Sequence, residues 1–117
     1  MASILHVDDD MNVRAMVKQM LALRKHKCVG AGSVPFGEAL AESQEFDLII
    51  CDGRVESEYD GADLAAKLVA KEYPAVILSS EYGARRKGVP FLLKPIPLDP
   101  HQFEQEFLEF VAANLKR

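Results

Sequence analysis

The sequence predicts an α/β fold in which helices cover both faces of a parallel β-sheet. Short apolar runs alternate along the chain with stretches whose apolar residues recur at helical spacing. The short runs are apolar at successive positions, which is typical of strands that are buried on both faces of a parallel sheet. We therefore expect a single domain over residues 1–117, with no output domain attached.

The first half of the chain contains three predicted strands and two predicted helices. Asp10 stands where the N-cap of the first helix is expected, directly before a periodic apolar pattern. Pro35 can open a short second helix, because proline is well tolerated in the first turn. The predicted strands cover residues 3–7, 28–31 and 46–51, and the first helix covers residues 11–24.

The second half repeats this alternation after a polar loop with the sequence DGRVESEYDG. A helix is predicted over residues 62–72, and strands are predicted over residues 75–79 and 89–93. Asp99 as N-cap and Pro100 at the first helical position start the last helix. Phenylalanines such as Phe103 and Phe107 form the apolar stripe of this helix.

The composition excludes several classes of function. The formal net charge is −4 and the isoelectric point is near 5.3, which argues against a surface for nucleic acid or anionic membrane. No apolar run approaches the roughly 20 residues of a membrane span, and no signal peptide is recognisable. Cys28 and Cys51 have no metal-ligand spacing, so we expect reduced thiols and a cytoplasmic location.

Polar residues follow four of the predicted strands. Asp8 and Asp9 come after the first strand, Asp52 after the third, Ser79 at the end of the fourth and Lys94 after the fifth. In a doubly wound sheet the carboxyl ends of the strands converge, so these side chains should meet. Clustered carboxylates repel one another, and a hard cation relieves that repulsion; we expect Mg²⁺. Lys94 and Ser79 suit a bound phosphoryl group.

These residues resemble the site of a two-component response-regulator receiver domain, the chemotaxis type that consists of one domain. The resemblance covers essentially the whole chain. It rests on the acidic pair, on Asp52 after DLIIC, on Ser79 after AVIL and on Lys94–Pro95 after FLL. It implies a flavodoxin-like, doubly wound sheet of five parallel strands in the order 2-1-3-4-5.

The resemblance implies a role for each matching residue. Asp52 would accept a phosphoryl group from a sensor histidine kinase or phosphotransfer protein, and a downstream protein target would read the phosphorylated state. The protein would then be no enzyme beyond its own phosphotransfer and dephosphorylation, and a monomer or weak dimer. Ser79 and Lys94 would hold phosphoryl oxygens, Ser79 and Phe91 would act as switch residues, and the Lys94–Pro95 bond would be cis. The ligands of Mg²⁺ would be Asp8, Asp9, Asp52 and the backbone carbonyl of Arg54.

The chain departs from the family pattern in two loops. The loop after Asp52 has no proline, and Gly61 stands nine residues after Asp52 instead of eight. The interval from Ser79 to Lys94 is several residues short and has little helical pattern. We therefore expect the family's fourth helix to be shortened or absent. Residues 80–88 should be mobile, because they offer almost no apolar face to bury.

Other functions remain open at this stage. An aspartate-nucleophile phosphatase of the haloacid dehalogenase type needs a residue with a hydroxyl group shortly after its acids. In this chain Met11 follows the acids, which disfavours that function. A flavin carrier would want a phosphate-binding loop where this chain has three acids. A pseudo-receiver that only binds partners would not need the intact acidic site. We expect Asp47 and Asp60 to be solvated, and His6 to be a half-buried strand residue.

Overall fold

The computed structural model describes residues 1–53 and 59–115. In these residues five parallel strands form one sheet in the order β2-β1-β3-β4-β5, which confirms the predicted topology. β1 lies in the interior of the sheet between β2 and β3. The strands are β1 (Ser3–Val7), β2 (Lys27–Ala31), β3 (Leu48–Asp52), β4 (Ala75–Ser79) and β5 (Phe91–Leu93).

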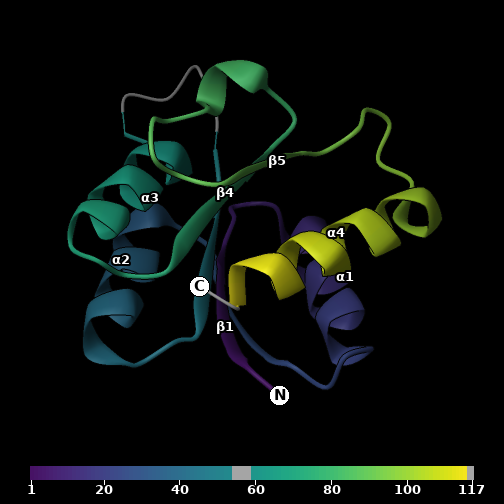
Figure 1. Cartoon of the computed structure of the whole chain (residues 1–117), viewed down its shortest axis with the longest axis horizontal. Helices are drawn as coiled ribbons and strands as arrows, with labels where there is room; N and C mark the ends of the chain where they lie inside the picture. Colours follow the sequence, from purple (N-terminus) through teal and green to yellow (C-terminus); the bar gives the residue numbers. More distant parts are fainter. Residues whose placement is uncertain (54–58, 116–117) are drawn as a thin grey trace.

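Helices cover both faces of the sheet, as the apolar strands predicted. α2 (Val34–Ser43) and α3 (Gly61–Ala70) lie on one face, at the left of Figure 1. α1 (Met11–Ala22) and α4 (Pro100–Leu115) lie on the other face, at the right. Each face has its own hydrophobic core, because alternate strand residues point to opposite sides: Leu5 and Val7 pack toward α2 and α3, and Ile4 packs toward α1 and α4.

Polar side chains start the helices where the sequence analysis placed caps. The Asp10 carboxylate accepts hydrogen bonds from the backbone N–H groups of Asn12 and Val13 at 2.8 and 3.2 Å. Asp99 accepts one from the N–H of His101 at 3.0 Å, at the start of α4. These bonds satisfy N–H groups that have no partner inside the helix.

Asp60 was predicted to be solvated, and this prediction is wrong. Its side chain is buried and caps α3 by accepting bonds from the N–H groups of Ala62 and Asp63. The Asp63 carboxylate in turn accepts from the N–H of Asp60, which completes a capping box. Buried backbone N–H groups at a helix start need acceptors, and this need keeps Asp60 inside.

The connection between β4 and β5 contains no α-helix, and all of its residues are described. One short 3₁₀ helix, η1 (Tyr82–Ala84), stands where the family's fourth helix would be, so α4 is the last helix of this chain. Ala84 is fully buried, and the Tyr82 ring stacks on Phe91 with ring centroids 6.1 Å apart. Ala84 therefore anchors the segment in the core, whereas Tyr82 stays largely exposed and covers one side of Phe91. The mobility of the segment stays a prediction.

Two further details differ from expectation. His6 is fully buried rather than half-buried, because β1 is an interior strand with helices on both faces. The cis peptide bond lies at Ile96–Pro97 and not at Lys94–Pro95. The N–H of Lys94 still bonds to the carbonyl of Ser79 at 2.7 Å, so Lys94 extends the β4–β5 pairing and the cis bond follows beyond it. No helix in the described part of the chain is long and apolar enough to cross a bilayer.

Candidate functional site

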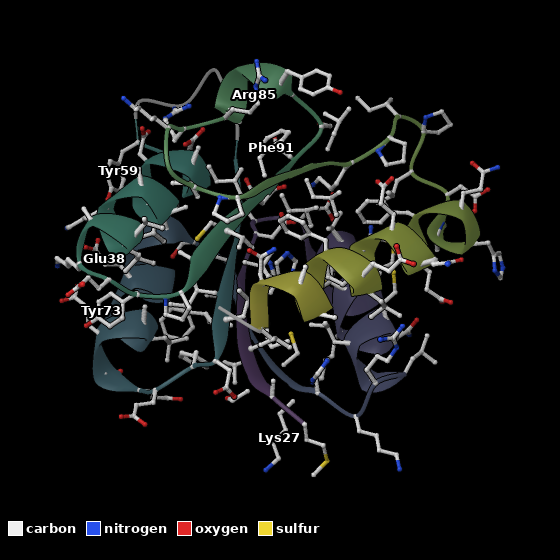
Figure 2. All side chains as sticks on the ribbon, in the orientation of Figure 1. Lys27, Glu38, Tyr59, Tyr73, Arg85 and Phe91 are labelled. Carbon is white, nitrogen blue, oxygen red and sulfur yellow. The ribbon has the colours of Figure 1, made fainter. Side chains whose placement is uncertain are left out.

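Three carboxylates meet where β1 and β3 end. The two strands are neighbours with Val7 opposite Cys51, so the residues that follow them arrive at the same edge of the sheet. Asp8 and Asp9 follow β1, and Asp52 is the last residue of β3. One oxygen from each carboxylate lies within 4.8 Å of the other two. Figure 2 places Arg85 and Phe91 toward this end of the molecule and Lys27 at the opposite end.

Asp8 is the most deeply buried of the three acids, with 3% of its surface exposed. Its Oδ1 accepts a hydrogen bond from the N–H of Asp10 at 2.9 Å. Its Oδ2 has no hydrogen-bond partner among the described residues, and His6 Nε2 lies 3.6 Å from it. Burial, and next the charge of Asp52, raise the pKa of Asp8 to about 6. The ionised carboxylate is therefore held at a cost in free energy.

His6 does not supply a balancing charge. Burial, and next the positive charges of Lys94 and Arg14, lower the pKa of His6 to about 3. The imidazole is neutral at physiological pH. The local excess of negative charge at Asp8 must be offset by something other than this histidine.

The cluster fits a hard divalent cation. Its donors are carboxylate oxygens, which Mg²⁺ and Ca²⁺ prefer, and the Asp8 carboxylate has a buried oxygen that lacks a partner among the described residues. Asp10, the third acid of the run, is occupied as the cap of α1. Arg54, whose carbonyl was predicted as a further ligand, lies outside the described residues.

Lys94 reaches the cluster from the end of β5. Its Nζ lies 2.5 Å from Oδ1 of Asp52, and the two side chains are only 12% and 9% exposed. Water therefore screens this pair weakly. The ammonium group balances one of the clustered negative charges and fixes the orientation of the Asp52 carboxylate.

Ser79 is fully buried beside the same residues. Its hydroxyl donates to the carbonyl of Gly53 at 2.6 Å and accepts from the N–H of Glu81 at 3.0 Å. Gly53 directly follows Asp52, so the hydroxyl links the third strand end to the segment after β4. Phe91 is half-buried, and it stacks on Tyr82, whose other neighbour is the Arg85 guanidinium at 5.3 Å from the ring centroid.

An open cavity of about 280 Å³ adjoins the acids. Besides the three aspartates, its lining includes the segment that joins β2 to α2, Tyr59 and Asp60 just before α3, and Gly61, the first residue of α3. Sequence reasoning did not single out Tyr59, because a tyrosine in a polar loop carries no spacing signal. It noted Gly61 only as displaced by one position from the family pattern.

Gly61 lies against the backbone of Asp52. A Cβ atom added at Gly61 would stand 1.9 Å from the Asp52 carbonyl oxygen, which no side chain can occupy without moving β3 or α3. We expect Gly61→Ala to destabilise the protein by about 1–3 kcal/mol, as overpacking does, and to disturb Asp52. Urea denaturation of the variant measures this. Gly30→Ala is the control for stability, because the nearest atom there is Cδ of the Arg14 side chain at 3.3 Å, which would need to shift by only a few tenths of an ångström; equal stability of both variants would contradict the expectation.

Comparison with known proteins agrees with this geometry. Residues 4–97 match the family described as the response regulator receiver domain. A search of curated protein sequences finds no significant match. Solved structures with the same fold include response regulator TrrA from Thermotoga maritima in complex with Mg²⁺-BeF, which is 21% identical with a TM-score of 0.73 and covers 94% of this chain and 99% of that chain.

Two further structures show the same architecture. The chemotaxis response regulator CheY4 of Vibrio cholerae is 24% identical with a TM-score of 0.73, covering 94% of this chain and 98% of that chain. A CheY-like receiver domain protein from Methanospirillum hungatei is 20% identical with a TM-score of 0.70, covering 97% and 96%. At such identities the likeness concerns the fold, and the family rests on the match over residues 4–97. With its five parallel strands and its acids gathered at the strand ends, this chain belongs to the response regulator receiver domain family.

Proposed function

We propose that this receiver accepts a phosphoryl group on Asp52 from the phosphohistidine of a sensor kinase or phosphotransfer protein, with Mg²⁺ bound, and signals to a downstream protein. The observation that carries the proposal is the position of Asp52 between two acids and a lysine. Its carboxylate lies within 4.8 Å of those of Asp8 and Asp9, and Lys94 holds one of its oxygens at 2.5 Å. A phosphoryl acceptor needs a fixed nucleophile and fixed positive charge, and this arrangement supports both.

The transfer balances without a further reactant. A carboxylate oxygen of Asp52 attacks the phosphorus atom of the donor, and the phosphorus–nitrogen bond to the histidine breaks. The electron pair stays on the imidazole nitrogen, and Asp52 becomes an acyl phosphate. The Lys94 ammonium, already at Asp52, stands where it can bind the phosphoryl oxygens as charge develops on them.

Asp8, Asp9 and Asp52 would hold the cation, as their clustered oxygens suit it. Mg²⁺ supplies the positive charge that lets a phosphoryl group approach carboxylates of the same sign. The complex of TrrA with Mg²⁺-BeF supports a metal in the proposal for this chain, because that protein has the same fold.

The signal would begin at Ser79. To donate to a phosphoryl oxygen on Asp52, its hydroxyl must give up the carbonyl of Gly53. The N–H of Glu81 is tied to the same hydroxyl, so the segment that contains η1 would be pulled with it. Phe91, stacked on Tyr82 of η1, would then change its surroundings. The target protein would read the surface formed by η1 and β5.

Asp52→Asn is expected to abolish labelling by acetyl phosphate or by a phosphorylated kinase in the presence of Mg²⁺. Asparagine keeps the size of the side chain but removes the nucleophilic oxygen anion. Intact-protein mass spectrometry with a base-lability assay measures the label, and Asp10→Asn is the control, because Asp10 only caps α1. Unlabelled wild-type protein would point to a pseudo-receiver, continuous phosphatase turnover to an enzyme, and a labelled Asp52→Asn variant to a different acceptor.

A further inference from the structure

Arg14, on α1, reaches back to the loop that carries the acidic pair. Its Nη1 donates a hydrogen bond to the backbone carbonyl of Asp8 at 2.6 Å. The side chain is half-buried, and none of the roles described above uses it. Side chains that bind the residues around a metal site control where the ligands stand, and their loss weakens metal binding.

The backbone of Asp8 is held on two sides by neighbouring segments. Its N–H donates to the carbonyl of Ala31, at the end of β2, at 2.9 Å. Its carbonyl lies beyond the last paired residue of β1, Val7, and Arg14 supplies a donor there. The position of the Asp8 carbonyl therefore depends on a side chain and not on the ladder of the sheet.

Two glycines make room for the arginine. A Cβ atom added at Gly30 would lie 3.3 Å from Cδ of Arg14, and one added at Gly32 would lie 3.3 Å from Nη1. Contacts this close would require the arginine to shift by a few tenths of an ångström. The side chain thus lies along the end of β2, beside Gly30 and Gly32. Between these glycines stands Ala31, the residue whose carbonyl holds the N–H of Asp8.

We infer that Arg14 is a positioning residue that holds the Asp8 backbone so that its carboxylate faces those of Asp9 and Asp52. The inference rests on the proposed function, since the site it positions is the Mg²⁺ site. Charge alone would have the opposite effect, because a guanidinium near the cluster disfavours a bound cation. Removing Arg14 should therefore tighten Mg²⁺ binding if only its charge matters, and weaken it if positioning matters.

The test is a titration of the full chain with Mg²⁺, followed by amide shifts in NMR spectra. We expect Arg14→Met to raise the Mg²⁺ dissociation constant about tenfold, the lower end of the range for residues that orient metal ligands. Arg14→Lys keeps the charge but lacks the planar group with its several donors, so it should recover only part of the affinity. An unchanged or lowered dissociation constant in Arg14→Met overturns the inference.

Three controls keep the outcomes distinct. Lys18→Met removes a charge from the exposed face of α1, one turn further on, and should not weaken binding. Gly30→Ala leaves every charge in place and crowds Arg14, so it should weaken binding in the same direction and carries the test if Arg14→Met does not fold. In an Asp8→Asn background Arg14→Met should add little, because both changes act through one ligand; full additivity would contradict this.

The result also separates the inference from the proposal on which it rests. If the wild-type protein shows no Mg²⁺-dependent shifts, the proposed function is wrong. If the wild type binds Mg²⁺ and Arg14→Met binds it equally well, or Gly30→Ala does so where Arg14→Met does not fold, the proposed function stands and the positioning role of Arg14 is wrong.

Discussion

Lys94→Met is expected to abolish phosphorylation of Asp52 and to destabilise the metal-free protein by about 3 kcal/mol, as the loss of one partner of a buried ion pair does. Lys94 and Asp52 are separated by 2.5 Å and nearly excluded from solvent. Without the ammonium group, three clustered carboxylates face one another, and water cannot replace the lost charge. Urea denaturation in the presence of EDTA measures the stability, and acetyl-phosphate labelling measures the function.

A second substitution and a surface control make this result specific. Lys94→Met combined with Asp52→Asn should recover most of the lost stability, because no unpaired charge remains at Asp52, but it should stay unlabelled. Lys67→Met breaks the exposed pair with Glu38, and pairs in water are worth only about 0–1 kcal/mol. A loss in Lys94→Met no larger than that in Lys67→Met would refute the assignment of the Lys94 pair.

Asp8→Asn is expected to stabilise the metal-free protein at about pH 8 by roughly 2–3 kcal/mol, the free energy equivalent to a shift of about two pKa units. The pKa of Asp8 rises from 3.8 to about 6 on folding, mainly because the carboxyl is buried. When folding raises the pKa of an acid, the group does not affect the free energy of unfolding at pH values below its pKa in the unfolded protein. The cost grows as pH rises from about 4 and is fully present above about 6.

The comparison needs two pH values and one metal addition. At about pH 4 the protonated Asp8 resembles asparagine, so the wild type and Asp8→Asn should differ little. Adding Mg²⁺ at high pH should stabilise the wild type and leave Asp8→Asn nearly unchanged. Asp10→Asn, which keeps a good cap outside the cluster, should show no such gain. If Asp8→Asn is less stable than wild type in EDTA at high pH, the carboxylate is not a cost to the fold.

The structure distinguishes the effects that the individual acids have on the stability of the metal-free protein. From the sequence, the clustered carboxylates were expected to repel one another as a group. In the structure Asp52 is paired with Lys94, whereas Asp8 is buried and one of its oxygens has no partner among the described residues. We therefore expect the metal-free protein to become more stable when the Asp8 carboxylate is removed. Removal of the Asp52 carboxylate, in contrast, also breaks its ion pair with Lys94.

Local patterns predicted what depends on local chemistry. The alternation of apolar runs and helical spacing predicts the layers of the fold, because the apolar residues of buried strands and of helices recur at different spacings along the chain. Asp10 and Asp99 were recognised as caps, because a cap is a contact within a few residues of chain. The meeting of Asp8, Asp9 and Asp52 followed from the parallel sheet, because the carboxyl ends of its strands share an edge.

Contacts between distant segments were decided by tertiary structure alone. Asp60 and His6 are buried because neighbouring helices and strands cover them. The type of a residue does not reveal which elements will pack against it. The Arg14 side chain that bonds to the Asp8 carbonyl lies beside Gly30 in β2 and Gly32 just after it, and these glycines carry no functional pattern in the sequence. The sequence by itself determined which chemical groups reach the site. The packing of strands and helices decided which of those groups are paired and which are buried at a cost, because burial and partners depend on residues far apart in the chain.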